Sequence, residues 1–316
     1  SSNSAISADN VWHWMRTHYN IGVQQGNKNA FIAPLIQAIV TNLQSNLNHS
    51  DGIKLAQILK QAFEEKHLVI LIEKSEISAL LARLGWDGAV RPGSGDFLMV
   101  VDSNVGYNKV NANIAQAITY TVDLQETVSP WAELMISYNN QGEKKDNCVH
   151  TKPFKLRSDD EFLYASQMDR CYWNYLRVLL PDGSQPQYAT RHPTPADWLV
   201  TGQADAGATT VGRGENGTTM LSALLVVPTG EQRTMRYAYQ LPPDILRRNE
   251  AGTWHYHLKI QKQAGREDIP VRLHIRLPAG ATFVSATPMP VHRQPQTLIF
   301  DMRLATDQSL DVWFRF

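Results

Sequence analysis

The chain has 316 residues, of which 43% are hydrophobic, and its 30 basic residues are balanced by 30 acidic residues. A chain of this length can bury a large core, and its balanced charge excludes a global field that would attract nucleic acid or an anionic membrane. No run reaches the about 18 apolar residues that a membrane span needs, and no signal peptide is recognisable. The chain opens SSNSA without a methionine, which is typical of a trimmed or processed product.

The first third of the chain is predicted to be helical. Apolar residues recur at helical spacing over residues 32–47, over a second segment from residue 50 and over residues 75–84. Two short apolar runs, residues 68–72 and 97–101, lack alternation, which predicts strands that are covered on both faces. These patterns indicate helices packed on a small mixed sheet.

The rest of the chain is predicted to be β-structure. Residues 118–124 and 134–138 alternate between apolar and polar, which predicts an antiparallel hairpin. From Cys171 onward the chain is almost entirely strand and turn: residues 172–180 and 222–227 are apolar runs that end at turns, and alternation recurs at residues 254–260, 271–277, 298–304 and 310–316. Many short alternating strands are typical of an immunoglobulin-like antiparallel β-sandwich.

The change of pattern predicts two domains in an α+β chain. We expect a helical α/β domain over residues 1–165 and a β-sandwich domain over residues 166–316. Residues 201–219 are small, polar and Gly-rich, which predicts a long surface loop.

The two cysteines, Cys148 and Cys171, lie in no CxxC motif and near no zinc-like histidine spacing. A disulfide between them would close a short loop and add about 3 kcal/mol through chain entropy. Such a bridge is typical of exported proteins. Two buried thiols are the alternative, and we favour the disulfide.

An asparagine-rich stretch follows the strand at residues 97–101. Its candidate ligand-binding residues are Asp102, Asn104, Gly106, Asn108, Lys109 and Asn111. It fails as an EF-hand, because Tyr107 stands at the invariant glycine and Asn113 at the bidentate glutamate. Short amides bond to nearby backbone and so predict a tight turn. The alternative is a ligand or partner site, since ligands tend to bind at the carboxyl ends of strands in sheets that carry helices.

Histidines form a second candidate group. His255, His257 and His274 project from the polar faces of their strands, and three neighbouring imidazoles could bind a metal. Fixed cations on the same faces oppose metal binding, so we expect no metal and a basic face that prefers anions: His255, His257, Lys259, Arg272, His274 and Arg276.

No catalytic signature is present. Residues 212–217 match GxGxxG, but a polar loop precedes them and a strand follows, which is the wrong context for a dinucleotide. Residues 93–95, Gly-Ser-Gly, are typical of a turn rather than of a nucleophile elbow. We therefore expect no cofactor.

Several segments carry a family resemblance: DSNVGYNK, CYWNYLRV, KQAG and the closing LIFDMRLATDQSLDVWFRF. They resemble the carboxyl-terminal half of domain-of-unknown-function family 4012, over most of residues 60–316. The resemblance implies a bacterial protein that is membrane-anchored through a preceding segment, with its bulk exported to the cell surface. It implies no catalytic residues.

Together these observations predict an exported, non-catalytic cell-envelope or surface module that binds a glycan or a protein partner and no nucleic acid. The alternative is part of an envelope glycopolymer or lipid-linked phosphate transferase or hydrolase, with its other half outside this chain. In that alternative Asp102, Asn104 and Lys109 would converge on an open cleft. If they bond back to their own loop, the alternative loses its site.

Overall fold

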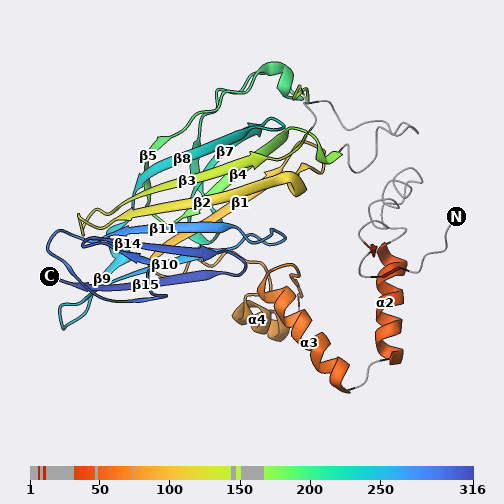
Figure 1. Cartoon of the computed structure of the whole chain (residues 1–316), viewed down its shortest axis with the longest axis horizontal. Helices are drawn as coiled ribbons and strands as arrows, with labels where there is room; N and C mark the ends of the chain where they lie inside the picture. Colours follow the sequence, from red (N-terminus) through yellow and green to blue (C-terminus); the bar gives the residue numbers. More distant parts are fainter. Residues whose placement is uncertain are drawn as a thin grey trace.

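The computed structural model describes residues 6–7, 10–11, 32–46, 49–73, 75–143, 147–150 and 167–316. Two mixed sheets face each other across one core, and the helices lie beside the sandwich (Figure 1). The chain is therefore an α+β protein in which a β-sandwich dominates.

The first sheet has eight strands. Its order is β12-β15-β10-β1-β4-β7-β6, and β9 pairs with β10. The bounds are β1 Asp96–Asn104, β4 Tyr172–Leu180, β6 Thr210–Arg213, β7 Thr219–Val227, β9 Leu246–Arg248, β10 Trp254–Gln261, β12 Thr282–Thr287 and β15 Gln308–Arg315. We call this sheet A.

The second sheet, sheet B, has seven strands in the order β13-β14-β11-β2-β3-β8-β5. The bounds are β2 Ile114–Asp123, β3 Trp131–Asn140, β5 Gln185–Ala189, β8 Gln232–Gln240, β11 Pro270–Arg276, β13 His292–Arg293 and β14 Thr297–Arg303. The predicted hairpin is β2 and β3. Two pairs, β1 with β10 and β2 with β11, are parallel, so the sandwich is not wholly antiparallel.

Strands from both predicted domains share each sheet. β1 pairs with β4 and β10, and β2 pairs with β11, so the division at residues 165 and 166 does not separate two cores. Local patterns could not reveal this, because periodicity identifies a strand but not its distant partner. The predicted loop at residues 201–219 also contains a strand, β6, which pairs with β7.

Strand β1 is covered on both faces, as its apolar run predicted. Leu98 and Val100 belong to the core between the sheets, whereas Phe97, Met99 and Val101 pack on the other face in a second cluster. The alternation also turns two acidic residues of this strand, at positions 96 and 102, toward the core side.

The first of these carboxylates, Asp96, is fully buried. Its Oδ2 accepts hydrogen bonds from Tyr256 Oη at 2.6 Å and Tyr120 Oη at 2.9 Å, and its Oδ1 accepts one from the backbone N–H of Phe97 at 2.7 Å. Tyr239 Oη donates in turn to Tyr120 Oη at 3.1 Å. Burial raises the pKa of Asp96 to about 6, although the tyrosine hydrogen bonds oppose that shift.

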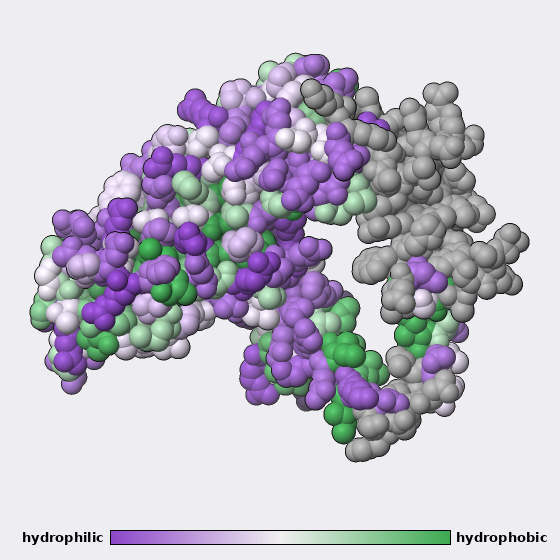
Figure 2. All heavy atoms as spheres, in the orientation of Figure 1, coloured by the Kyte–Doolittle hydropathy of each residue, from purple (hydrophilic) through white to green (hydrophobic). Residues whose placement is uncertain are grey.

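The three predicted helices are confirmed as α2 Ile32–Asn46, α3 His49–Glu64 and α4 Ser75–Leu84. Residues 68–72 form no strand, and Leu71 is 89% exposed. The prediction that this run and residues 97–101 form a small sheet covered by the helices is therefore wrong. No described helix is both long and apolar enough to span a membrane. Apolar side chains remain exposed on the helices (Figure 2), among them Ile36, Ile39, Ile53 and Ile58.

The segment after α3 docks on the loop between β10 and β11 and on the loop between β14 and β15. The Lys66 ammonium donates to Asp307 Oδ1 at 2.6 Å, and the Lys66 carbonyl accepts from the Gly265 N–H at 2.9 Å. The buried Lys262 ammonium donates to the carbonyls of Glu65, at 2.7 Å, and Arg266. Burial, followed by the charge of Lys66, lowers the pKa of Lys262. These bonds hold the β10–β11 loop in a defined position.

Candidate ligand-binding pocket

The asparagine-rich stretch folds into a turn whose side chains bond to each other. Asn104 Nδ2 donates to Asn108 Oδ1 at 2.9 Å and to Asn111 Oδ1 at 2.6 Å, and Asn104 Oδ1 accepts from the Gly106 N–H at 2.9 Å. The backbone N–H of Lys109 donates to the Gln167 carbonyl at 2.9 Å. This is the tight turn that the amides predict.

Gly106 lies against a buried tryptophan. A Cβ at this position would lie 2.7 Å from Trp173 Cε3. Trp173 is 3% exposed, and its Nε1 donates to the Trp198 carbonyl at 2.8 Å, so the ring cannot move aside. Only glycine allows this close approach.

We expect Gly106→Ala to lower the free energy of unfolding by about 1 to 3 kcal/mol, because it overpacks this contact. Chemical denaturation measures the effect. Gly212→Ala is the control, since a Cβ there would meet only the flexible end of Met220 at 3.8 Å. Equal losses in the two variants would show that the contact with Trp173 is not the cause.

The second core-side carboxylate, Asp102, is also withdrawn from solvent, with a side chain that is 1% exposed. Its Oδ1 accepts from Tyr138 Oη at 2.6 Å and from Asn174 Nδ2 at 2.7 Å. The Arg266 guanidinium lies 3.6 Å from its Oδ2. Asp102 therefore organises a buried network and does not face an open cleft.

This network lies behind the floor of a pocket of about 540 Å³, and Arg266 connects the two. Arg266 Nη2 donates to Gln116 Oε1 at 2.6 Å, and Gln116 Nε2 donates to Tyr138 Oη at 3.2 Å. Both Arg266 and Gln116 line the pocket. The floor side chains are thus held by one another and by Asp102 before any ligand arrives.

The walls come from segments that are distant in the sequence. They include Asn111 from the 3-10 turn η1 (Val110–Asn113), Gln141 after β3, Glu267 and Asp268 from the β10–β11 loop, and Arg303 at the end of β14. Arg303 is paired with Asp268. In the described part of the chain, the buried Nε of Arg266 has no hydrogen-bond partner. The pocket therefore offers amides and balanced charges.

Of the six residues predicted from the asparagine-rich stretch, one lines this pocket, Asn111. Sequence reasoning missed Gln116, Tyr138, Asn174 and Arg266. A signal existed for Gln116, because it occupies an apolar phase of β2 between Ile114 and Ile118. A polar residue at such a position needs a hydrogen-bond partner, but the sequence does not say which one.

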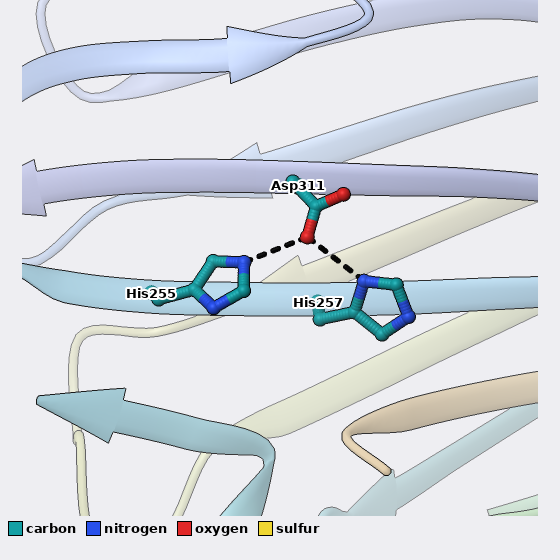
Figure 3. A group of neighbouring side chains, drawn as sticks. All are labelled: His255, His257 and Asp311. Carbon is teal, nitrogen blue, oxygen red and sulfur yellow. Dashed lines mark hydrogen bonds and ion pairs between the residues drawn. The ribbon is translucent and has the colours of Figure 1, made fainter. Parts of the chain in front are cut away.

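The predicted basic face is divided between the two sheets, which corrects that prediction. Sheet A has His255, His257 and Lys259, and sheet B has Arg272, His274 and Arg276. β10 pairs with β15, β9 and β1, whereas β11 pairs with β14 and β2, so the histidines do not form one cluster. Instead His255 and His257 converge on Asp311 of β15 (Figure 3).

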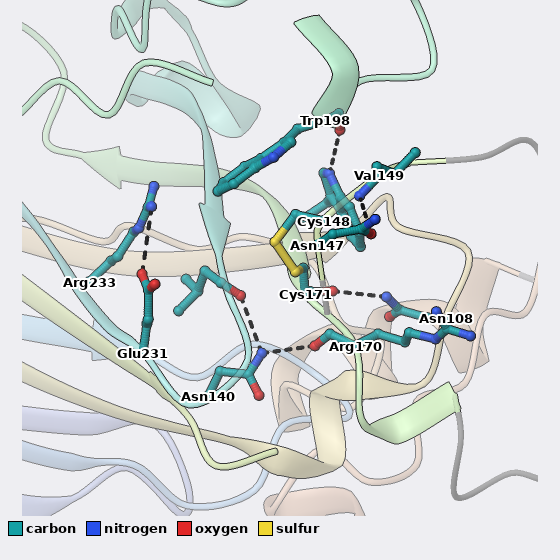
Figure 4. Close-up of a disulfide and its surroundings, with 12 residues drawn as sticks. Asn108, Asn140, Asn147, Cys148, Val149, Arg170, Cys171, Trp198, Glu231 and Arg233 are labelled. Atoms are coloured by element: carbon teal, nitrogen blue, oxygen red, sulfur yellow. Dashed lines mark hydrogen bonds and ion pairs between the residues drawn. A yellow bond between two sulfur atoms is a disulfide. The ribbon is translucent and has the colours of Figure 1, made fainter. Parts of the chain in front are cut away.

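The predicted disulfide is confirmed. Cys148 and Cys171 are bonded, both are buried, and their Cα atoms lie 5.4 Å apart (Figure 4). Asn108 Nδ2 donates to the Cys171 carbonyl at 2.9 Å, so the bridge is connected to the asparagine-rich turn. The disulfide thereby supports the segment that contributes Asn111 to the pocket.

No protein-family model and no curated protein matches this chain. Among solved structures it is similar to a protein from Legionella pneumophila named a "putative nutrient binding protein", with a TM-score of 0.39 and 10% identity over 71% of this chain and 72% of that one. Yeast LTA4 hydrolase gives a TM-score of 0.33 and 9% identity, over 66% of this chain and 30% of that one.

An M1 zinc metallopeptidase from Deinococcus radiodurans gives a TM-score of 0.25 and 10% identity, over 63% of this chain and 42% of that one. The chain thus spans less than half the length of the yeast hydrolase and of this metallopeptidase. At these TM-scores none of the likenesses supports a functional argument. The resemblance to family 4012 stays a prediction.

Proposed function

We propose that this chain is an exported, non-catalytic module of a bacterial cell envelope or surface that binds a glycan in the pocket above Asp102. The observation that carries the proposal is the pocket itself, of about 540 Å³, with a preorganised polar floor. That volume lies within the range of about 300 to 1,000 Å³ that is usual for small-molecule sites. The buried disulfide supports an oxidising compartment.

The chemistry of the lining favours a neutral polar ligand. Arg266 and Arg303 are balanced by Glu267 and Asp268, so no net positive field is present that would select a phosphate. Amide and guanidinium groups can instead exchange directional hydrogen bonds with sugar hydroxyls. A protein partner at this pocket is the other outcome of the test.

Isothermal titration calorimetry tests the proposal with N-acetylated disaccharides and neutral envelope polysaccharide fragments. Gln141→Ala and Glu267→Ala remove exposed lining side chains and should each weaken binding by about tenfold, the value of one good hydrogen bond. Gln294→Ala is the matched control, because this exposed glutamine precedes β14, whereas Arg303 at the far end of β14 lines the pocket.

Equal glycan affinity in all three variants would contradict binding in this pocket. The absence of any glycan binding, combined with capture of an envelope protein that depends on Gln141 and Glu267, would replace the glycan by a protein partner. Binding of polyprenyl phosphate in preference to neutral sugars would instead support the transferase or hydrolase alternative.

Nothing in the described residues favours that alternative. Asp102 is buried against Tyr138 and Asn174, and Asn104 bonds within its own turn, so neither side chain is directed at a substrate. Membrane anchoring through a preceding segment is part of the proposal. The proposal also includes a relationship of this sandwich to the immunoglobulin fold. That relationship would have to accommodate the two parallel strand pairs.

A further inference from the structure

We propose that His255, His257 and Asp311 form a binding site for a divalent transition-metal ion on the outer face of sheet A. Asp311 Oδ1 lies 2.7 Å from His255 Nε2 and 2.9 Å from His257 Nδ1 (Figure 3). One ligand atom from each residue lies within 4.8 Å of the others. This inference goes beyond the proposed glycan binding and does not depend on it.

The strands place these donors together. Two residues apart on β10, His255 and His257 point to the same face of the sheet, and the register pairs His257 with Asp311 on β15. His255 stacks on Trp313, with ring centroids 4.8 Å apart and planes 5° apart. The arrangement therefore rests on paired backbone and a packed ring.

The donor set suits a transition metal. Two imidazoles and one carboxylate are ligands of zinc and of non-haem iron. Metal–ligand bonds of about 2.1 Å place neighbouring ligand atoms about 3.0 Å apart in octahedral geometry and about 3.4 Å apart in tetrahedral geometry. The two observed nitrogen–oxygen distances of 2.7 and 2.9 Å are shorter than these values, so a metal that replaces the two hydrogen bonds requires the side chains to move apart by a few tenths of an ångström.

Of the three cations that the sequence analysis set against a metal, two lie on the other sheet and the third is directed away from the histidines. Arg272 and Arg276 are on sheet B, where they pair with Asp301 and Asp123. Lys259 directs its ammonium to the Arg91 carbonyl at 2.8 Å. The repulsion expected from these three residues is therefore largely absent, and the cation that remains beside the cluster is Arg247 of β9.

One side of the cluster is open to solvent. The histidine side chains are 32% exposed and that of Asp311 is 26% exposed. A pocket of about 210 Å³ adjoins the histidines, with Ser94, Gly95 and Arg247 in its lining. A Cβ at Gly95 would lie 2.7 Å from the His257 carbonyl, so glycine lets this wall approach. Three protein ligands with an open position describe an exchangeable site rather than a closed structural one.

The open position also indicates the fourth ligand. Arg247 of β9 is paired in register with His255 and lines the same pocket. A bound metal together with this guanidinium would attract water, hydroxide or a small anion such as a carboxylate. A bulky neutral ligand would not fit the space.

The test uses tag-free, chelator-treated full chain titrated with Zn²⁺ by calorimetry and with Co²⁺ by visible absorption. We expect one equivalent to bind and Co²⁺ to show ligand-field bands. His255→Gln and Asp311→Asn each remove one ligand and should weaken binding by about a hundredfold or more, above the loss typical of outer-shell changes. His274→Gln on sheet B is the matched control and should leave the affinity unchanged.

Three results would overturn the site. These are no Zn²⁺ or Co²⁺ binding to the unmodified chain at millimolar metal, unchanged affinity in both ligand variants, or the same loss in His274→Gln. Thermal unfolding without metal is measured for each variant, so that a folding defect is not read as lost coordination. If a ligand variant unfolds, His257→Gln provides the second test of the same cluster.

Discussion

Asp102→Ala is expected to lower the free energy of unfolding by about 3 to 5 kcal/mol, the usual cost of removing one partner from a buried charged network. The change leaves Tyr138 Oη and Asn174 Nδ2 without their acceptor and leaves the Arg266 guanidinium without its nearby carboxylate. Tyr138 and Asn174 are fully buried, so water cannot replace the bonds that they lose. Urea denaturation measures the loss.

Two further variants give that experiment its controls. Asp102→Asn keeps an oxygen that can accept from Tyr138 and Asn174, so it should lose less than half as much stability. Asp301→Ala breaks an exposed pair with Arg272 and should change stability little, because solvent screens such a pair. If Asp102→Ala costs no more than Asp301→Ala, the network does not hold the pocket floor.

The second large effect is a loss of stability as the pH rises through the folded-state pKa of Asp96. Burial raises that pKa from 3.8 to about 6. Between these values the folded chain keeps the proton while the unfolded chain has released it, so unfolding releases a proton and rising pH favours it. The stabilisation is complete below pH 3.8 and is lost by about pH 6, a total of about 3 kcal/mol.

Asp96→Asn isolates this contribution because it removes the titrating group. Unfolding free energies of the variant and the unmodified chain are compared at each pH, so that titrations common to both cancel. From about pH 4 to pH 7 the difference should shift by about 3 kcal/mol in favour of the variant. Parallel curves over that range would mean that Asp96 does not keep its proton in the fold.

Local patterns predicted much of the secondary structure. The apolar spacing identified α2, α3 and α4, and alternation identified β2, β3 and most strands after Cys171. The short amides predicted the turn at Asn104 and Asn108, because such side chains reach only nearby backbone and each other. Composition and spacing also favoured the disulfide, which the structure contains.

Those local patterns could not predict which strands pair with one another. Residues 68–72 resemble a buried strand, yet they pair with no strand in the described part of the chain, and the run stays irregular with Leu71 exposed. His274 has the same polar phase on its strand as His257, but it lies on sheet B. Alternation places Asp311 on a polar face of its strand but gives no reason to single it out. In the structure Asp311 is paired in register with His257.

By itself, the sequence determined most of the helices and strands, which of their side chains face inward and where the chain turns, because these depend mainly on residues close in the chain. Only the tertiary structure decided that β1 and β2 belong to the sandwich, that Asp102 reaches Arg266, and that His255 and His257 share Asp311. A period of two specifies the face of a strand but not its partner, and both candidate sites are built across such partners.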